Sequence, residues 1–308
     1  MPARTRLWRT DRPVSLGAQL GVFRRGPGDP TSLWTEGGAF VRAAQTPDGP
    51  GALHLVCRAP GREVEATAWG PGADWLLDGV PDLLGAADDP TGFVAHHDVV
   101  RDAWRRFPGW RVPRSRLVLD ALVPAVIEQK VTGQEAFAGY RRLVRRFGSP
   151  APGPYGRVGL FVPPRPAEWA AIPSWAFLQA SVDGARSRAL VVAARAAGRL
   201  EEAVDLGPGE AVRRMRALPG VGVWTSAEVA QRALGDADAV SFGDFHVAKD
   251  IGWALVGAAV DDAGLAELLE PYAAHRYRVQ ALLGLAGHRR PRRGARMPLR
   301  GHLPVRGR

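Results

Sequence analysis

Hydrophobic residues alternate with polar or small residues in two stretches near the N-terminus. A period of two is typical of β-strands that bury one face. Clusters of glycine and proline at 26–30 and 47–51 mark turns between such strands. Residues 1–112 are therefore predicted to form a small β-rich N-terminal domain. The alternating hydrophobic positions are Leu53, Leu55 and Cys57 in the first stretch, and Val64, Ala66 and Ala68 in the second.

After residue 112 the hydrophobic positions follow the three-to-four-residue period of α-helices. The clearest stripes run over 119–131 and 137–147, and four arginines occupy the other face of the second. Residues 113–286 are predicted to form a mainly α-helical body, so the expected fold class is α+β. Further helices are predicted over 167–180, 186–199, 209–217, 224–234, 245–256 and 264–284.

The composition excludes several classes of protein. Hydrophobic residues make up 46% of the 308 residues, which is too many for a disordered chain. No window approaches ~18 uninterrupted apolar residues, so no membrane-spanning helix is expected. Cys57 is the only cysteine, which excludes an internal disulfide and a cysteine-ligated zinc. The N-terminus lacks the apolar segment of a secretory signal, so a cytoplasmic protein is expected.

The positive charge is concentrated at one end of the chain. The net charge is +10, yet residues 287–308 hold eight arginines and no acidic residue. This segment is predicted to be a basic, flexible tail, and the rest of the chain is nearly neutral. Clustered arginines attract phosphates by releasing counterions, but such a tail also serves simply to keep a protein soluble. The charge alone is therefore weak evidence for a nucleic-acid partner.

The segment Leu218-Pro219-Gly220-Val221-Gly222 lies between two predicted helices. Two glycines separated by one apolar residue form a tight turn whose backbone N–H groups can face outward. Such donors can approach a phosphate oxygen closely, because glycine has no side chain. A helix–hairpin–helix of this kind holds the DNA backbone without reading its sequence. A plain interhelical turn is the alternative interpretation of the segment.

Asp244 is the second informative residue. It directly precedes a predicted amphipathic helix, where an aspartate is a good N-cap. It also follows Gly222 by 22 residues, which is one helix and one loop beyond the hairpin. The hairpin, together with an aspartate in an Asp-x-His-Val context, resembles the helix–hairpin–helix DNA glycosylase superfamily of base-excision repair.

More narrowly, the chain resembles the bacterial 3-methyladenine DNA glycosylase II group, over residues 115–285. That group also carries a β-rich accessory domain. The resemblance implies an enzyme that flips a damaged purine out of double-stranded DNA and hydrolyses its N-glycosidic bond. The segments that carry the resemblance are Ile127-Glu128-Gln129-Lys130-Val131-Thr132, the helix start at 182–189, and Pro271-Tyr272 with Arg276.

The resemblance also implies roles for individual residues. Asp244 would be the catalytic carboxylate, because a fixed negative charge stabilises an oxocarbenium-like sugar. The base pocket would contain Trp224, Glu228, Phe245 and Gln129. The residues implied in DNA binding are Lys130, Thr132, Gly220, Val221, Gly222, Thr225 and His246. The backbone carbonyls implied in binding a monovalent cation, Na⁺ or K⁺, are those of Arg216, Leu218 and Val221.

Trp224 bears on the reaction type. Superfamily members that also cleave the DNA strand carry a nucleophilic lysine two residues after the second hairpin glycine, and here that position is Trp224. The resemblance therefore implies a monofunctional, monomeric enzyme of the bacterial nucleoid that needs no other cofactor. Strand incision would be left to a separate abasic-site endonuclease.

Two departures from the group leave the substrate open. Glu228 stands where a pocket tyrosine occurs in the group, so it lines the pocket or faces solvent. Lys130 stands where an apolar wedge residue is expected. The leading hypothesis is a glycosylase for alkylated purines. The alternatives are a glycosylase for oxidised or deaminated bases, which a pocket carboxylate would favour, and a non-catalytic damage-binding protein.

Overall fold

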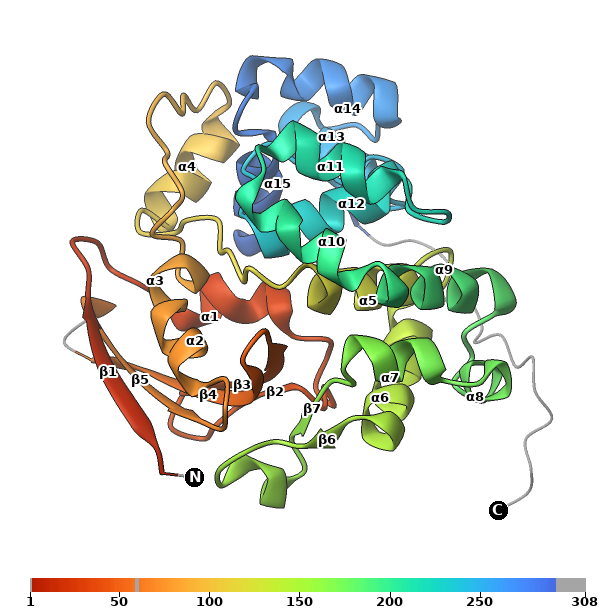
Figure 1. Ribbon diagram of the computed structural model, residues 1–308. Helices are drawn as coiled ribbons and strands as arrows, with labels where there is room; N and C mark the ends of the chain where they lie inside the picture. Colours follow the sequence, from red (N-terminus) through yellow and green to blue (C-terminus); the bar gives the residue numbers. More distant parts are fainter. Residues whose placement is uncertain (1, 59–60, 292–308) are drawn as a thin grey trace.

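A computed structural model describes residues 2–58 and 61–291 (Figure 1). Near the N-terminus, five antiparallel strands form one sheet in the order β1-β5-β4-β3-β2. The two predicted alternating stretches are neighbours in it, because Leu53 pairs with Ala68 and Leu55 with Ala66. Helix α2 packs on β1, β4 and β5, which buries the apolar face of the sheet. The strands are β1 Arg4–Arg9, β2 Ser32–Trp34, β3 Phe40–Thr46, β4 Gly49–Arg58 and β5 Glu63–Trp69, and the helices beside them are α1 Leu16–Leu20, α2 Ala73–Asp78 and α3 Val80–Leu83.

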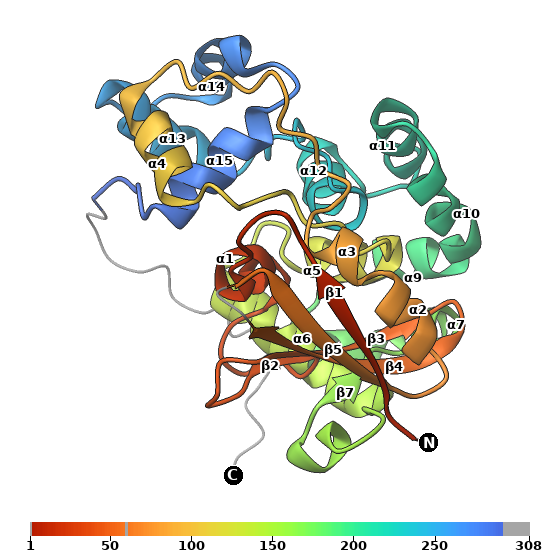
Figure 2. The same ribbon diagram turned by 90° about the vertical axis from the view of Figure 1, so that its left-hand side faces the viewer.

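The rest of the chain is mainly helical, and the predicted α+β class is confirmed. Helix α5 lies at its centre and buries every residue except Asp120. Figure 2 shows the sheet in the lower part of the molecule, a group of helices above it, and α5 between them. The helices are α4 Asp98–Arg106, α5 Val118–Ile127, α6 Gly133–Phe147, α7 Pro166–Ala171, α8 Ser174–Gln179, α9 Gly184–Arg195, α10 Ala197–Glu201, α11 Pro208–Arg216, α12 Val223–Val229, α13 Val247–Val256, α14 Asp262–Leu269 and α15 Arg276–Leu285.

Two predicted helices are each divided in the structure. The segment 167–180 forms α7 and α8, which are separated at Pro173. The segment 264–284 forms α14 and α15, with a short 3₁₀ turn that contains Pro271 between them. A proline lacks the N–H that a continuous helix needs and its ring clashes with the preceding turn, so both predictions of one long helix are wrong.

The predicted helix over 224–234 changes its geometry part-way. Its first part is α12, and Ala230–Leu234 continues as a turn of π-helix. Such turns are rare and widen the helix locally. In this turn Arg232 lies four residues after Glu228, and the two side chains form an ion pair.

Helix α4 packs with the C-terminal helices, although the sequence predicted that residues 1–112 form the β-rich N-terminal domain. It contacts α15, and Val100 shares a buried cluster with Ile251 and Leu265. Trp110 is buried against Tyr277 and Leu282. The chain therefore leaves the sheet before residue 112. Most of the predicted basic tail, residues 292–308, lies outside the described residues. No helix in the described part of the chain is long and apolar enough to cross a bilayer.

Candidate active site

The predicted hairpin joins α11 to α12. The Val221 N–H donates to the Leu218 carbonyl at 3.1 Å, which closes the turn. Gly220 has a φ of +86°, and a Cβ atom there would lie 2.7 Å from the Cβ of Ala189 on α9. Only glycine fits this position without strain. Gly222 is exposed and would have open space around a Cβ atom, so its backbone faces solvent.

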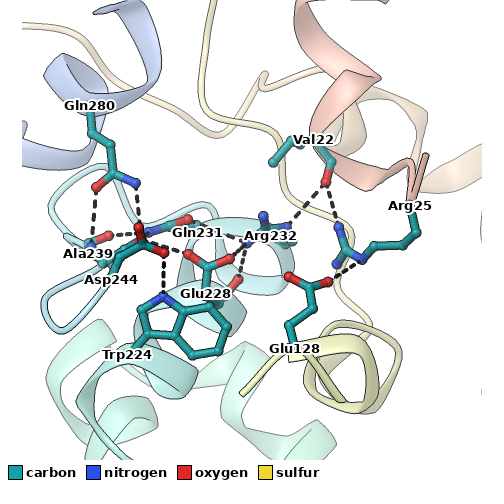
Figure 3. A network of polar contacts seen from close by, with 11 residues as sticks. Val22, Arg25, Glu128, Trp224, Glu228, Gln231, Arg232, Ala239, Asp244 and Gln280 are labelled. Atoms are coloured by element: carbon teal, nitrogen blue, oxygen red, sulfur yellow. Dashed lines mark hydrogen bonds and ion pairs between the residues drawn. The ribbon is translucent and has the colours of Figure 1, made fainter. Parts of the chain in front are cut away.

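Asp244 lies in the loop before α13, and its carboxylate accepts three hydrogen bonds. Its Oδ1 accepts from the backbone N–H groups of His246 at 2.7 Å and Val247 at 3.0 Å. Its Oδ2 accepts from the indole Nε1 of Trp224 at 3.2 Å (Figure 3). Donors on both oxygens fix the orientation of the carboxylate. The structure therefore brings together the two residues from which the sequence inferred catalysis and the absence of strand cleavage.

The segment between α5 and α6, residues 128–132, is called the wedge loop below. Gln129 connects it to the hairpin, because its Nε2 donates to the Gly220 carbonyl and to the Thr225 Oγ1, both at 2.8 Å. Lys130 is exposed and has a φ of +55°. Thr132 caps α6 by accepting from the Glu135 N–H at 3.3 Å. Gln129, Lys130 and the hairpin are therefore neighbours in the fold.

No protein-family model matches this sequence, and no curated protein sequence matches it. Solved structures do match. A 3-methyladenine DNA glycosylase from Archaeoglobus fulgidus has a TM-score of 0.75 at 16% identity, over 91% of this chain and 98% of that one. This chain has the helix–hairpin–helix DNA glycosylase fold.

Two further structures share the glycosylase fold. The 8-oxoguanine glycosylase/lyase of Clostridium acetobutylicum has a TM-score of 0.69 at 13% identity, over 92% of this chain and 97% of that one. The 3-methyladenine DNA glycosylase of Schizosaccharomyces pombe, in complex with abasic DNA, has a TM-score of 0.50 at 17% identity, over 61% of this chain and 91% of that one. The matches thus include proteins named for different damaged bases.

Within the glycosylase fold, Glu228 lies in a buried polar network and is only 8% exposed. Its Oε2 pairs with Arg232 Nη1 at 2.7 Å, and its Oε1 accepts from Ser241 Oγ at 2.6 Å. Gln231 and Gln280 also donate to Ser241 Oγ. Burial is the largest single influence and opposes the charge of Arg232, but Glu228, Tyr277 and Glu128 together outweigh it and raise the pKa of the guanidinium. Glu228 is therefore paired inside the protein, and the alternative that it faces solvent is wrong.

Phe245 is the aromatic candidate next to the aspartate, and it is 68% exposed. Lys249 Nζ lies 3.9 Å from its ring centroid, and the guanidinium of Arg290 lies 5.9 Å from it. An exposed ring between two cations, beside Asp244, suits a polyanion such as DNA. The sequence did not predict the cation pair, although Lys249 follows Phe245 by four residues across the start of α13, which was a usable signal.

His246 and three further tryptophans have simpler environments. His246 is exposed and contacts the Phe245 ring edge-on at 5.0 Å. Trp253 and Trp175 are each about half exposed, and Trp110 is buried in the core. Across residues 2–58 and 61–291, no group of three or more His, Cys, Asp or Glu side chains could hold a metal ion. The carbonyl of Leu218 keeps one lone pair beside its hydrogen bond, so the hairpin stays chemically compatible with the predicted monovalent cation.

Proposed function

We propose that this protein is a monofunctional DNA glycosylase of base-excision repair that removes alkylated purines of the 3-methyladenine type. The observation that carries the proposal is the Asp244 carboxylate, fixed by three N–H donors within contact of Trp224. The fold similarity supports the general class of activity. The substrate and the mechanism are inferred from the residues of the site.

DNA would be held from two sides of the site. The exposed backbone of Gly220 and Gly222 accommodates a phosphate closely, since neither residue has a side chain to keep it away. On the other side, Lys130 extends from the wedge loop, where it would fill the space that an extruded base leaves in the duplex. Our proposal includes Na⁺ or K⁺ at the hairpin carbonyls of Arg216, Leu218 and Val221.

The proposed reaction depends on a carboxylate that stabilises positive charge, and not on an acid that protonates the leaving base. When the N-glycosidic bond breaks, its electron pair goes to the base nitrogen and positive charge develops on the sugar. Asp244 stabilises that charge and orients the water whose oxygen bonds to C1′, and it accepts the proton the water loses. An alkylated purine already carries positive charge, so it leaves without being protonated. The Trp224 ring would favour such a cationic base by cation–π attraction.

We expect no strand cleavage because position 224 is a tryptophan and not a lysine. An indole cannot form the Schiff base that a lysine would, so the abasic product would pass to a separate endonuclease. Lys249 stacks on Phe245 at 3.9 Å from the ring centroid, which occupies its ammonium group. The alternative of an oxidised or deaminated base rested on a free pocket carboxylate at 228. Its pairing with Arg232 removes that support.

A base-release panel tests the proposal. Duplexes that contain 7-methylguanine, 3-methyladenine, 8-oxoguanine or uracil are incubated with the protein, and free bases are separated by chromatography. We expect the two alkylated bases to be released, the abasic strand to stay intact and borohydride to trap no covalent complex. Release of 8-oxoguanine or uracil alone would establish the alternative substrate class. Tight binding of abasic-analogue DNA without any base release would identify a damage-binding protein.

Replacing Gly222 with valine is expected to weaken DNA binding about tenfold and to lower stability only slightly, the small loss arising because valine is a poorer N-cap for α12 than glycine. A Cβ atom at 222 meets nothing within 4 Å, so the side chain would project toward the phosphate instead of into the protein. Affinities are measured on damaged and undamaged duplexes, and we expect equal losses on both. The matched variant Gly220→Val should lower the unfolding midpoint as well, because of the contact with Ala189. Unchanged affinity in Gly222→Val would contradict the role of the hairpin.

A further inference from the structure

The carbonyl oxygen of Val22 accepts hydrogen bonds from two guanidinium groups. Arg25 Nη1 donates to it at 3.0 Å and Arg232 Nε at 3.2 Å (Figure 3). Val22 lies in a 3₁₀ turn, Gly21–Phe23, between strands β1 and β2, whereas Arg232 lies after α12. This contact, 210 residues apart along the chain, joins the N-terminal region to the helical body.

The first guanidinium connects Val22 to the wedge loop. Arg25 Nε lies 3.2 Å from Glu128 Oε1, and the two side chains are only 9% and 21% exposed. Both atoms are buried, and neither makes a hydrogen bond within the described residues, so the contact is an ion pair alone. Glu128 is the C-cap of α5 and the first residue of the wedge loop. Arg25 is itself fixed, because its backbone N–H donates to the buried Asp29 carboxylate at 2.6 Å.

The second guanidinium leads toward the catalytic loop. Arg232 pairs with Glu228, whose other oxygen accepts from Ser241 Oγ at 2.6 Å. The Asp244 N–H in turn donates to the Ser241 carbonyl at 3.2 Å. Val22, Arg25, Glu128, Arg232 and Glu228 are called the Val22 network below. The network thus reaches both sides of the site, the wedge loop and the loop that carries Asp244.

The wedge loop needs such support. Lys130 has a φ of +55°, a left-handed conformation that is strained for a lysine and persists only where its surroundings impose it. Gln129 fixes one side of the loop to the hairpin through two hydrogen bonds. The ion pair of Arg25 with Glu128 fixes the end of the loop that adjoins α5. Both of its atoms are shielded from water, so their attraction is screened less than that of an exposed pair.

We propose that the N-terminal region positions the wedge loop for base extrusion, and that Arg25 does this through Glu128. The inference rests on the proposed glycosylase function, because it assigns the wedge loop a role in extruding the base. Arg25 and Glu128 are positioning residues in this proposal. Neither side chain contacts the reacting atoms in this proposal. The N-terminal region would contribute to base extrusion through the wedge loop.

The test separates extrusion from chemistry. The double variant Arg25→Met with Glu128→Gln removes both charges and leaves no unpaired buried ion. Single-turnover base release is measured for 7-methylguanine paired with cytosine, and for the same lesion opposite an abasic analogue, where extrusion breaks no base pair. We expect a loss of about tenfold on the paired duplex and less than about twofold opposite the abasic analogue. The fluorescence of 2-aminopurine beside the lesion should report the slower extrusion directly.

The ion pair of Arg42 with Asp120 provides the matched control. It also joins the sheet to α5, at side-chain exposures of 9% and 17%, but it lies at the opposite end of that helix from the wedge loop. Arg42→Met with Asp120→Asn should lower the unfolding midpoint to a similar degree without a selective loss on the paired duplex. An equal loss on both duplexes in the Arg25 variant, or the same selective loss in the control, would overturn the inference. If the wild-type protein releases no base from either duplex, the proposed glycosylase function is wrong. If the wild-type protein is active but the Arg25 variant shows no selective loss, only the positioning role of Arg25 is wrong.

Discussion

Asp244→Asn is expected to lower the single-turnover rate of base release by a factor on the order of 10³ while binding abasic-analogue DNA as tightly as the wild-type protein. The asparagine keeps the shape of the side chain and can still accept from His246 and Val247. It loses the negative charge that faces the developing oxocarbenium ion. The measurement is base release under saturating enzyme with 7-methylguanine DNA, together with an affinity titration. Full activity in this variant would refute the carboxylate mechanism.

Two companion variants isolate the cause. Trp224→Phe keeps the carboxylate and the aromatic ring but removes the N–H that donates to Oδ2, so it should reduce the rate less than Asp244→Asn does. Asp250→Asn changes the same type of charge on the neighbouring helix, where Asp250 pairs with Arg290 at 3.5 Å. That control should change the rate less than about twofold, because it leaves the charge of Asp244 and all three of its donors in place. A large effect of Asp250→Asn would point to a general loss of fold.

Local sequence patterns predicted the strands well because their signal is local. Leu53, Leu55 and Cys57 alternate, and they pair across the sheet with Ala68, Ala66 and Val64. The hydrophobic stripe that predicted α5 likewise reflects a helix that is buried nearly all round. The two long helices were predicted wrongly because the periodic pattern continued through Pro173 and Pro271. A proline lies at each of these two breaks, and hydrophobic periodicity does not register its missing N–H.

The candidate site was predictable only as far as its segments resemble a known group. Asp244 and Trp224 were named from that resemblance, and the structure shows that they touch. The pairing of Glu228 with Arg232 had a signal in the sequence, since opposite charges four residues apart share a helix face. The contact of Arg25 with Glu128 joins residues whose positions along the chain are unrelated by any local period. Such a contact follows from how the sheet packs on α5, which no sequence pattern near either residue encodes.

Glu228→Ala is expected to lower the free energy of unfolding by about 3–5 kcal/mol, because it leaves the Arg232 guanidinium buried without its counterion. Since the pKa of Arg232 lies above its ordinary value, this group stays charged throughout the range in which the protein can be studied. Its contribution is fully present below the unfolded pKa, so the loss should be the same at about pH 6 and about pH 8. Urea unfolding at both pH values measures it. Glu210→Ala, which removes an exposed partner of Arg213, should cost less than about 1 kcal/mol.

The same variant decides between two roles for position 228. If Glu228 holds Arg232 and Ser241 in place, its loss should also disturb the loop that carries Asp244, and base release should fall for every accepted lesion alike. A pocket carboxylate would behave differently, because its removal would leave stability unchanged and alter which bases are released. Glu228→Gln sharpens the comparison, since it keeps the hydrogen-bonding shape and removes only the charge. A shift in base preference at full stability in either variant would restore Glu228 to the base pocket and remove it from the Val22 network.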